Sequence, residues 1–299
     1  MNRVLAMNEP DRLTVADVAV PDDKKSTFRL QMKPGPVLVD MWPARSARPA
    51  TPILLIHGWG GSGSYWRGTA EHLSSDATVI VPDLPGTGRS QPVKQTQDMF
   101  DQVDTLRRVV DSLSAEKIQI VGHSMGAAMA LLLNDLIPER VERLVLTSMC
   151  FFMTAKQAEI YESIMKFVRL TMRVRWKEMV DIPGLSYLMA QRYFYRVPRD
   201  RAALRQGFLD YLTLDYDTAS ACAANATDPR IEAAGTRVKV PTLLIACRQD
   251  QVMPVENVNY SVDKIPGCEL RWIEECGHLP MVEKAEEYRA ILRDFLWQK

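Results

Sequence analysis

The 299-residue chain is long enough for one large α/β domain or two smaller ones, and its 46% hydrophobic and 25% charged residues are typical of a globular protein. Its 37 basic residues balance 37 acidic ones, which argues against broad electrostatic capture of nucleic acid or of an anionic membrane. No apolar run reaches the ~18 residues that a membrane span needs, and the N-terminal stretch lacks the apolar core of a secretory signal. We therefore expect no nucleic-acid partner, no stable membrane insertion and a cytoplasmic location.

The cysteines fit this setting. Five of them are scattered along the chain, and no C-x-x-C pair occurs among Cys150, Cys222, Cys247, Cys268 and Cys276. An odd number without paired spacing disfavours both a disulfide framework and a structural zinc site. We expect reduced cysteines, no metal and no other cofactor.

Seven short apolar runs, bounded by Pro, Gly or Asp, predict buried strands at 36–42, 52–58, 77–83, 117–123, 143–148, 241–247 and 268–274. The central runs lack polar alternation, which is typical of strands covered on both faces. Between them, apolar residues at spacings of three and four predict a helix over 97–114, and the segments that begin at Met125 and Ala285 also predict helices. This alternation predicts an α/β fold with a mostly parallel central sheet flanked by helices.

The alternation stops near residue 150 and resumes near residue 238. Residues 150–225 are rich in aromatic residues and methionine at helical spacing, and they contain no strand-like run. We predict an all-helical insertion at 150–225 in a core domain formed by residues 1–149 and 226–299.

Two glycine-rich stretches follow predicted strands. HGWGGSG at 57–63 fits G-x-G-x-x-G, and Asp83 ends the next strand, so a dinucleotide site is one interpretation. The motif does not follow the first strand, however, and no Gly-Lys-Ser/Thr accompanies it, which makes this interpretation the weaker one. PDLPGTGRS at 82–90 predicts a tight turn, because Pro and Gly favour unusual dihedrals, and we expect Asp83 and Arg89 to brace it.

A serine stands between two glycines where a predicted strand becomes a predicted helix. The sequence from Gly122 to Gly126, GHSMG, fits G-x-S-x-G, and the strand–helix context is the one that a nucleophile elbow requires. Larger residues than glycine would clash in so sharp a turn, which exposes the Ser124 hydroxyl at the sheet edge beside free N–H groups of the helix. A small-residue turn without chemistry would explain the glycines, but not the histidine and aspartate described next.

A serine is a weak nucleophile unless a base takes its proton. Among the four histidines, His278 follows the last strand and a glycine, where a loop can bring it over the sheet edge. His72 lies in a polar helical segment, His57 is expected to orient the glycine loop, and the His123 side chain is expected to leave the strand end in another direction. We predict that His278 is the base.

The base needs an acid that fixes its tautomer and stabilises the imidazolium. Asp250 lies in the loop after the preceding strand, 241–247. The competing position, after the strand at 143–148, holds Met149 and Cys150 and offers no carboxylate. We predict that Asp250 is the acid.

Together these residues resemble the α/β-hydrolase fold family, in its serine esterase-like branch with a helical cap. The resemblance covers about 36–149 and 238–299, and Ser124, Asp250 and His278 follow one another in the order of that family. Its markers are HGWG at 57–60, DLPGTGRS at 83–90, GHSMG at 122–126, Asp250, and Gly277-His278 with Glu283. Cys247 and Ala127 stand where the family often has glycine, and neither touches the proposed chemistry.

The resemblance implies a catalytic triad of Ser124, Asp250 and His278, with backbone N–H groups of Trp59 and Met125 in the oxyanion hole. It also implies that residues 150–225 form a cap or lid. A serine nucleophile disfavours the dehalogenase and epoxide-hydrolase branches, which need a carboxylate.

The predicted activity is therefore hydrolysis of a small to medium apolar carboxylic ester through an acyl-enzyme. Alternatives on the same triad are a C–C bond hydrolase, a thioesterase, a lactonase or amidase, and a lyase; a non-hydrolytic ligand-binding protein is the rival from another class. We expect Phe151, Phe152, Val252 and Leu279 to line the substrate pocket.

Overall fold

The structure is a computed structural model that describes residues 13–15 and 24–298. Residues 1–12, 16–23 and 299 lie outside the described residues. They include part of the predicted core domain and most of the N-terminal stretch in which we expect no secretory signal.

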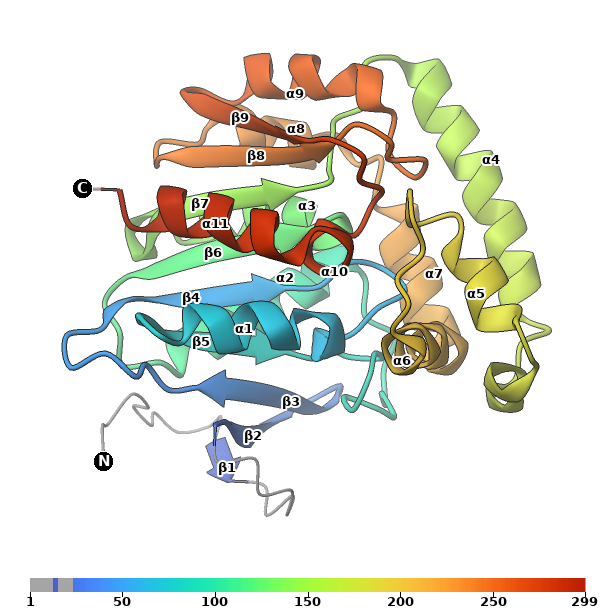
Figure 1. Cartoon of the computed structure of the whole chain (residues 1–299), viewed down its shortest axis with the longest axis horizontal. Coiled ribbons are helices and arrows are strands. Elements are labelled where there is room, and N and C mark those ends of the chain that lie inside the picture. Colours follow the sequence, from blue (N-terminus) through green and yellow to red (C-terminus); the bar gives the residue numbers. More distant parts are fainter. Residues whose placement is uncertain (1–12, 16–23, 299) are drawn as a thin grey trace.

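Nine strands of the described chain form one sheet in the order β1-β2-β3-β5-β4-β6-β7-β8-β9 (Figure 1). The strands from β4 to β9 run parallel, and β1, β2 and β3 extend the sheet at one edge in antiparallel pairs. Their bounds are β1 (Leu13–Val15), β2 (Ser26–Met32), β3 (Gly35–Trp42), β4 (Ala50–Ile56), β5 (Ala77–Pro82), β6 (Ile118–His123), β7 (Val141–Thr147), β8 (Thr242–Cys247) and β9 (Cys268–Ile273).

The seven predicted strands are all present, each with its ends within two residues of the prediction. The prediction of a mostly parallel sheet is confirmed, whereas β1 and β2 were not predicted. β2 lies near the antiparallel edge and buries only alternate residues at its end, with Leu30 and Met32 buried and Arg29 and Gln31 exposed. This half-polar pattern hides β2 from a search for continuous apolar runs.

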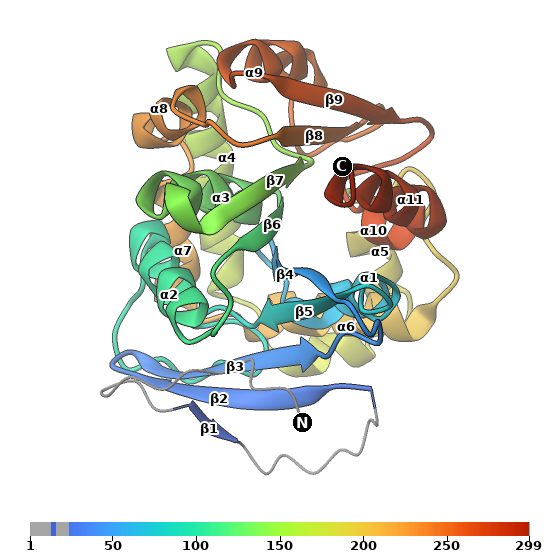
Figure 2. The ribbon, with the colours of Figure 1, turned by 90° about the vertical axis from the view of Figure 1, so that its left-hand side faces the viewer.

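Helices cover both faces of the sheet, because successive side chains of its strands point to opposite faces. On β4, Leu54 and Ile56 pack in the core on the side of α2 and α3, while Ile53 and Leu55 pack on the side of α1 and α11. Figure 2 shows these two helical layers. The layers contain α1 (Arg67–Leu73) with α10 (Pro280–Glu283) and α11 (Ala285–Leu296), and on the other face α2 (Met99–Asp111), α3 (Met125–Leu136), α8 (Pro229–Thr236) and α9 (Val258–Lys264).

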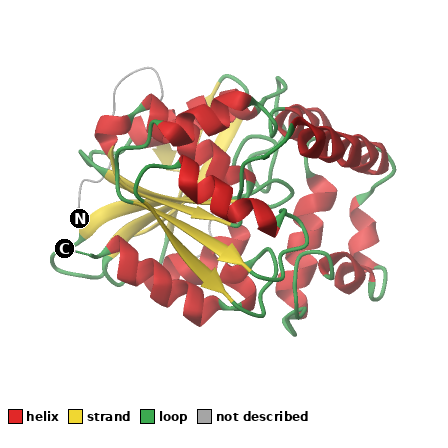
Figure 3. Ribbon diagram, turned by 90° about the horizontal axis from the view of Figure 1, so that it is seen from above, coloured by secondary structure: helices red, strands yellow, loops and turns green. Residues whose placement is uncertain are grey.

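Between β7 and α8 the described chain is helical and contains no strand. We call its helices α4 to α7 the inserted helices; they are α4 (Ala155–Met172), α5 (Leu185–Ala190), α6 (Arg201–Thr213) and α7 (Tyr216–Ala224). Short 3₁₀ turns complete the chain at Gly63–Trp66, Pro138–Arg140, Lys177–Asp181 and Val255–Asn257. The inserted helices stand beyond the carboxyl ends of the parallel strands (Figures 1 and 3). None of the described helices is both long and apolar enough to cross a membrane.

Candidate active site

The turn at Ser124 joins the end of β6 to the start of α3 in a strained conformation. Ser124 has φ 54° and ψ −122°, in the positive-φ region that side chains other than glycine rarely adopt. Its amide donates to the Thr147 carbonyl over 2.8 Å, which fixes the turn against β7. A Cβ atom at Gly122 would lie 2.4 Å from the Gly126 carbonyl oxygen, and one at Gly126 would lie 2.5 Å from the Ile56 carbonyl oxygen. The tight approach of backbone to backbone explains why both flanking residues are glycine.

Asp250 and His278 meet in loops at the carboxyl ends of β8 and β9. Asp250 Oδ2 lies 2.8 Å from His278 Nδ1, and both side chains are buried. Asp250 Oδ1 accepts from the amides of Val252 at 2.8 Å and Met253 at 3.0 Å. Burial alone would raise the Asp250 pKa, but the imidazole and these amides lower it. The carboxylate therefore stays ionised at neutral pH, accepts the proton of His278 Nδ1, and leaves His278 Nε2 available to other groups.

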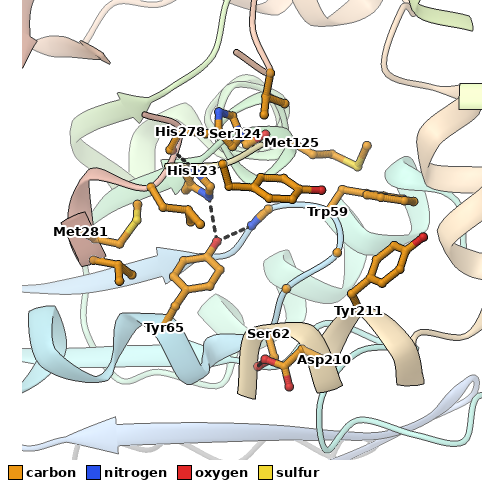
Figure 4. A pocket seen from close by; sticks show the side chains of 18 of the residues that line it. Trp59, Ser62, Tyr65, His123, Ser124, Met125, Asp210, Tyr211, His278 and Met281 are labelled. Carbon is orange, nitrogen blue, oxygen red and sulfur yellow. Dashed lines mark hydrogen bonds between the residues drawn. The ribbon is translucent and has the colours of Figure 1, made fainter. Parts of the chain in front are cut away.

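Trp59 and Met125 border the same cavity as Ser124 and His278 (Figure 4). Trp59 follows β4, and Met125 is the first residue of α3, where N–H groups have no partner within the helix. Among the described residues, neither amide donates a hydrogen bond to another protein group. Two amide donors thus remain free beside the strained serine.

His57 holds the glycine loop at 57–63, as the position of this histidine in the sequence predicted. Leu84 N–H donates to His57 Nε2 over 3.1 Å, so His57 Nδ1 carries the proton and donates to the Gly58 carbonyl over 3.0 Å. Burial lowers the His57 pKa, which keeps the ring neutral. Because a peptide unit is planar, this bond to the Gly58 carbonyl also fixes the direction of the Trp59 N–H.

The turn at 82–90 is braced by charged side chains. Asp83 Oδ2 accepts from Arg89 Nε over 2.7 Å, and Asp83 Oδ1 accepts from the Gly63 amide over 2.8 Å. Arg89 also donates to Asp40 over 2.9 Å. These bonds tie the turn to the glycine loop and to β3, and they occupy Asp83, the acid that a dinucleotide site would need for a ribose.

A cavity of about 1690 Å³ lies between the strand ends and the inserted helices. The four predicted pocket residues, Phe151, Phe152, Val252 and Leu279, all border it. Phe151 is only 4% exposed and belongs to the hydrophobic core, so it mainly packs. Phe152 is half-buried, and its ring centroid lies 5.3 Å from that of Tyr161 on α4. The inserted helices add mostly apolar groups to the wall, among them Tyr161, Met165, Val168, Met189 and Phe208.

The inserted helices also contact the glycine loop. Asp210 on α6 is buried, and its Oδ2 accepts from Ser62 Oγ over 2.6 Å and from Ser64 Oγ over 2.8 Å. Trp59 Nε1 donates to the Ala219 carbonyl on α7 over 2.9 Å. The loop that presents the Trp59 amide is therefore bonded to two of the inserted helices.

A second group of contacts reaches the His278 loop. The His278 amide donates to the Tyr193 carbonyl over 2.7 Å, just after α5. Glu283 accepts from the amides of Gly277, Tyr195 and Arg196 at 2.8, 3.2 and 2.5 Å. One side of the candidate site is thus joined by hydrogen bonds to α6 and α7, and the other to the segment between α5 and α6.

Sequence reasoning missed several of these residues. His123 was expected to leave the strand end in another direction from the serine, yet its ring centroid lies 4.8 Å from that of His278. Tyr65 and Asp210 carry no motif, since each gains its importance only from contacts distant in sequence. His72 is half-buried on α1 and does not border the cavity, as expected of a histidine outside the site. In the described parts of the chain, no cluster of three or more His, Cys, Asp or Glu could hold a metal ion.

Comparison with known proteins places this geometry in a family. The chain is 26% identical over 264 residues to the dihydrolipoyllysine-residue acetyltransferase component of the acetoin cleaving system of Cupriavidus necator. That match covers 85% of this chain but only 65% of the longer relative. The chain is also 27% identical to the 2-hydroxymuconate semialdehyde hydrolase of Pseudomonas sp. strain CF600, over 82% of this chain and 86% of the relative.

Solved structures agree on the fold. A thermophilic esterase from Thermogutta terrifontis superposes with a TM-score of 0.70 at 21% identity, over 91% of this chain and 98% of that one. A family model described as the alpha/beta hydrolase fold matches residues 51–285, which include the glycine loop, the serine turn and the Asp250–His278 pair. The chain belongs to the alpha/beta hydrolase fold family.

Proposed function

We propose that the protein is a serine hydrolase that cleaves small to medium apolar carboxylic esters through an acyl-enzyme. The observation that carries the proposal is the strained serine beside the buried Asp250–His278 pair, in the wall of one largely apolar cavity. Strain at a single non-glycine residue is costly, and it is usually retained where it serves a site.

In the proposed reaction, Ser124 Oγ attacks the ester carbonyl carbon while His278 Nε2 takes the hydroxyl proton. The Trp59 and Met125 amides donate to the oxygen that becomes negative. The C–O bond to the alcohol breaks as the imidazolium returns the proton to the leaving oxygen. Water then attacks the acyl-serine, with His278 again as base, and releases the carboxylic acid and the free serine.

We propose that the inserted helices act as a cap that selects the substrate. The apolar wall supplied by α4 and α5 supports this role, because apolar pockets with few polar groups bind apolar ligands. The cavity of about 1690 Å³ exceeds the ~300–1,000 Å³ of typical ligand pockets, so it can admit an acyl chain of several carbons.

A screen of p-nitrophenyl esters from acetate to hexanoate, run beside Ser124→Ala, tests the proposal. Each added methylene should contribute up to ~0.8 kcal/mol, about fourfold in kcat/KM, until the pocket is full. An organophosphonate should label Ser124 in the wild type and nothing in Ser124→Ala, as read by peptide mass spectrometry. A label on another serine would overturn the assignment of the nucleophile, and equal rates on all chain lengths would overturn the role of the cap.

The second candidate is C–C bond hydrolysis on the same triad. The observation that favours it is the 27% identity to a 2-hydroxymuconate semialdehyde hydrolase across most of both chains. Parallel assays with 2-hydroxymuconate semialdehyde and with p-nitrophenyl butyrate separate the two functions. A higher kcat/KM on the semialdehyde would favour the C–C bond hydrolase, and a higher kcat/KM on the ester would favour the esterase.

A further inference from the structure

A largely buried chain of hydrogen bonds lies behind the candidate site and joins its two sides. The Gly58 amide and the Tyr65 hydroxyl are 2.6 Å apart, and the same hydroxyl lies 2.9 Å from His123 Nδ1. At the other end, His123 Nε2 lies 2.9 Å from the His278 carbonyl oxygen. Figure 4 shows Tyr65 below His123, with dashed lines marking the two bonds of its hydroxyl.

The protons on these groups follow from the charge of His123. Burial, with the neighbouring His278 imidazole, lowers the His123 pKa to about 3, so the ring is neutral and carries one proton. The His278 carbonyl can only accept, so that proton is on His123 Nε2. The Gly58 N–H can only donate, so the Tyr65 oxygen accepts from it while the Tyr65 O–H donates to His123 Nδ1.

We propose that Tyr65 and His123 are positioning residues that hold the oxyanion loop and the catalytic histidine in register. This inference rests on the proposed function, in which Trp59 N–H binds the oxyanion and His278 is the base. Tyr65 fixes the amide of Gly58, one residue before Trp59. His123 fixes the carbonyl of His278 itself, and it precedes Ser124 directly in the chain.

Tyrosine suits this position because one hydroxyl serves both neighbours. Phenylalanine would keep the ring packing, in which the Tyr65 ring centroid lies 5.5 Å from that of His123 and 5.3 Å from that of Trp66. It would leave the Gly58 amide and His123 Nδ1 without partners, and buried polar groups without partners tend to move until they find one. A small displacement of catalytic groups has a large effect on rate, because transition-state binding depends on their geometry.

The structure offers a matched control for Tyr65→Phe. Tyr288 on α11 is fully buried, whereas Tyr65 is half-buried, and the Tyr288 hydroxyl lies 2.9 Å from Thr147 Oγ1 on β7. Tyr288→Phe therefore removes one buried tyrosine hydroxyl whose hydrogen bond, among the described residues, goes to the Thr147 side chain and not to the glycine loop or His123. A fall in unfolding temperature that both variants share measures the structural cost of losing a tyrosine hydroxyl. A fall in kcat that only Tyr65→Phe shows measures positioning.

Steady-state kinetics with p-nitrophenyl butyrate, and inhibition by a boronic acid that mimics the tetrahedral intermediate, give the first test. Removing an oxyanion donor outright costs ~10²–10³ in kcat, so displacing one through Tyr65→Phe should cost ~10-fold. We expect KM to change less than twofold and the affinity for the boronic acid to fall in parallel with kcat. Tyr288→Phe should change neither, while both variants unfold at a lower temperature. A Tyr65→Phe variant with the kcat of Tyr288→Phe would overturn the proposal.

A spectroscopic readout keeps the proposal testable without catalysis. ¹⁵N NMR of the four histidine rings, with His72→Gln and His123→Gln for assignment, reports which nitrogen carries each proton. In the wild type, His123 should be protonated at Nε2 only, and Tyr65→Phe should shift its Nδ1 resonance. If the wild type hydrolyses no ester, the proposed function is wrong. The positioning role of Tyr65 and His123 is wrong if the NMR spectrum shows His123 protonated at Nδ1.

Discussion

The helix that follows the serine and the first inserted helix have opposite surroundings. Nine of the twelve residues of α3 are buried, whereas α4 buries only Met172 among its eighteen. Phe167 on α4 is 67% exposed and Ile160 is 51% exposed. Core groups near the serine are therefore fixed by packing from every side, while most of α4 is free to shift without opening a packed core.

The inserted helices are held to the core where the candidate site lies. Their own buried clusters are small, with Met172, Leu214 and Ala219 in one and Val180, Phe208 and Leu212 in the other. Asp210 on α6 accepts hydrogen bonds from the glycine loop, and the Tyr193 carbonyl, between α5 and α6, accepts one from the His278 amide. The comparison indicates a rigid centre around Ser124, beside inserted helices that are held to it by polar contacts and by the packing of Cys222 on α7 in the main core.

The largest expected effect is in the rigid centre, at Asp250. Asp250→Asn should fold, because the amide is nearly isosteric, but kcat should fall by ~10³–10⁴ since the wrong imidazole tautomer would face the serine. Single-turnover kinetics with a p-nitrophenyl ester measure the acylation step directly. If Asp250→Asn kept the wild-type rate of acylation, a different carboxylate would have to orient the base.

The next largest effect is on stability, and it contrasts a glycine in α3 with a glycine in α6. Gly126→Ala would place a Cβ 2.5 Å from the His57 carbonyl oxygen, and backbone cannot retreat as a side chain can. It should lower the free energy of unfolding by ~1–3 kcal/mol or more. Gly207→Ala on α6 meets no atom within 4 Å, so it should raise that free energy by ~0.5–1 kcal/mol. Urea unfolding measures both, and a loss of stability in Gly207→Ala would mean that α6 is packed as tightly as α3.

Asp210 links α6 to the glycine loop, and we expect its substitution to have an intermediate effect on stability. Asn offers one acceptor where the carboxylate accepts from Ser62, Ser64 and Gln206. Asp210→Asn should therefore cost ~1–3 kcal/mol of stability, the usual penalty for buried polar groups left without partners. Hydrogen exchange should rise in α6 and in the glycine loop together. Exchange that rose in α6 alone would show that the loop does not depend on the inserted helices.

The sequence predicts the residues of the rigid centre better than those of the inserted helices, for a physical reason. Ser124, Asp250 and His278 follow predicted strands, and parallel strands bring their carboxyl ends to one edge, so spacing along the chain implies proximity in space. Tyr65, Asp210 and Tyr193 act through contacts with residues far away in sequence, which no local pattern encodes. The helical character of 150–225 follows from its spacing, but the side chain that each helix buries depends on how the helices lie on the core.

The smallest effect is expected on the outer face of α4, where a large apolar substitution should barely change stability. Phe167→Ala removes a mostly exposed ring, so the free energy of unfolding should change by ~0.5 kcal/mol or less. Met172→Ala in the same helix removes a buried side chain from the cluster with Leu214, and it should cost ~2–5 kcal/mol. Urea unfolding of the two variants, with kcat/KM on p-nitrophenyl hexanoate, compares the two faces of one helix. A cost at Phe167 equal to that at Met172 would mean that the outer face of α4 is covered in solution. If a second copy of the chain covers it, the cost of Phe167→Ala should depend on protein concentration, because association stabilises by mass action.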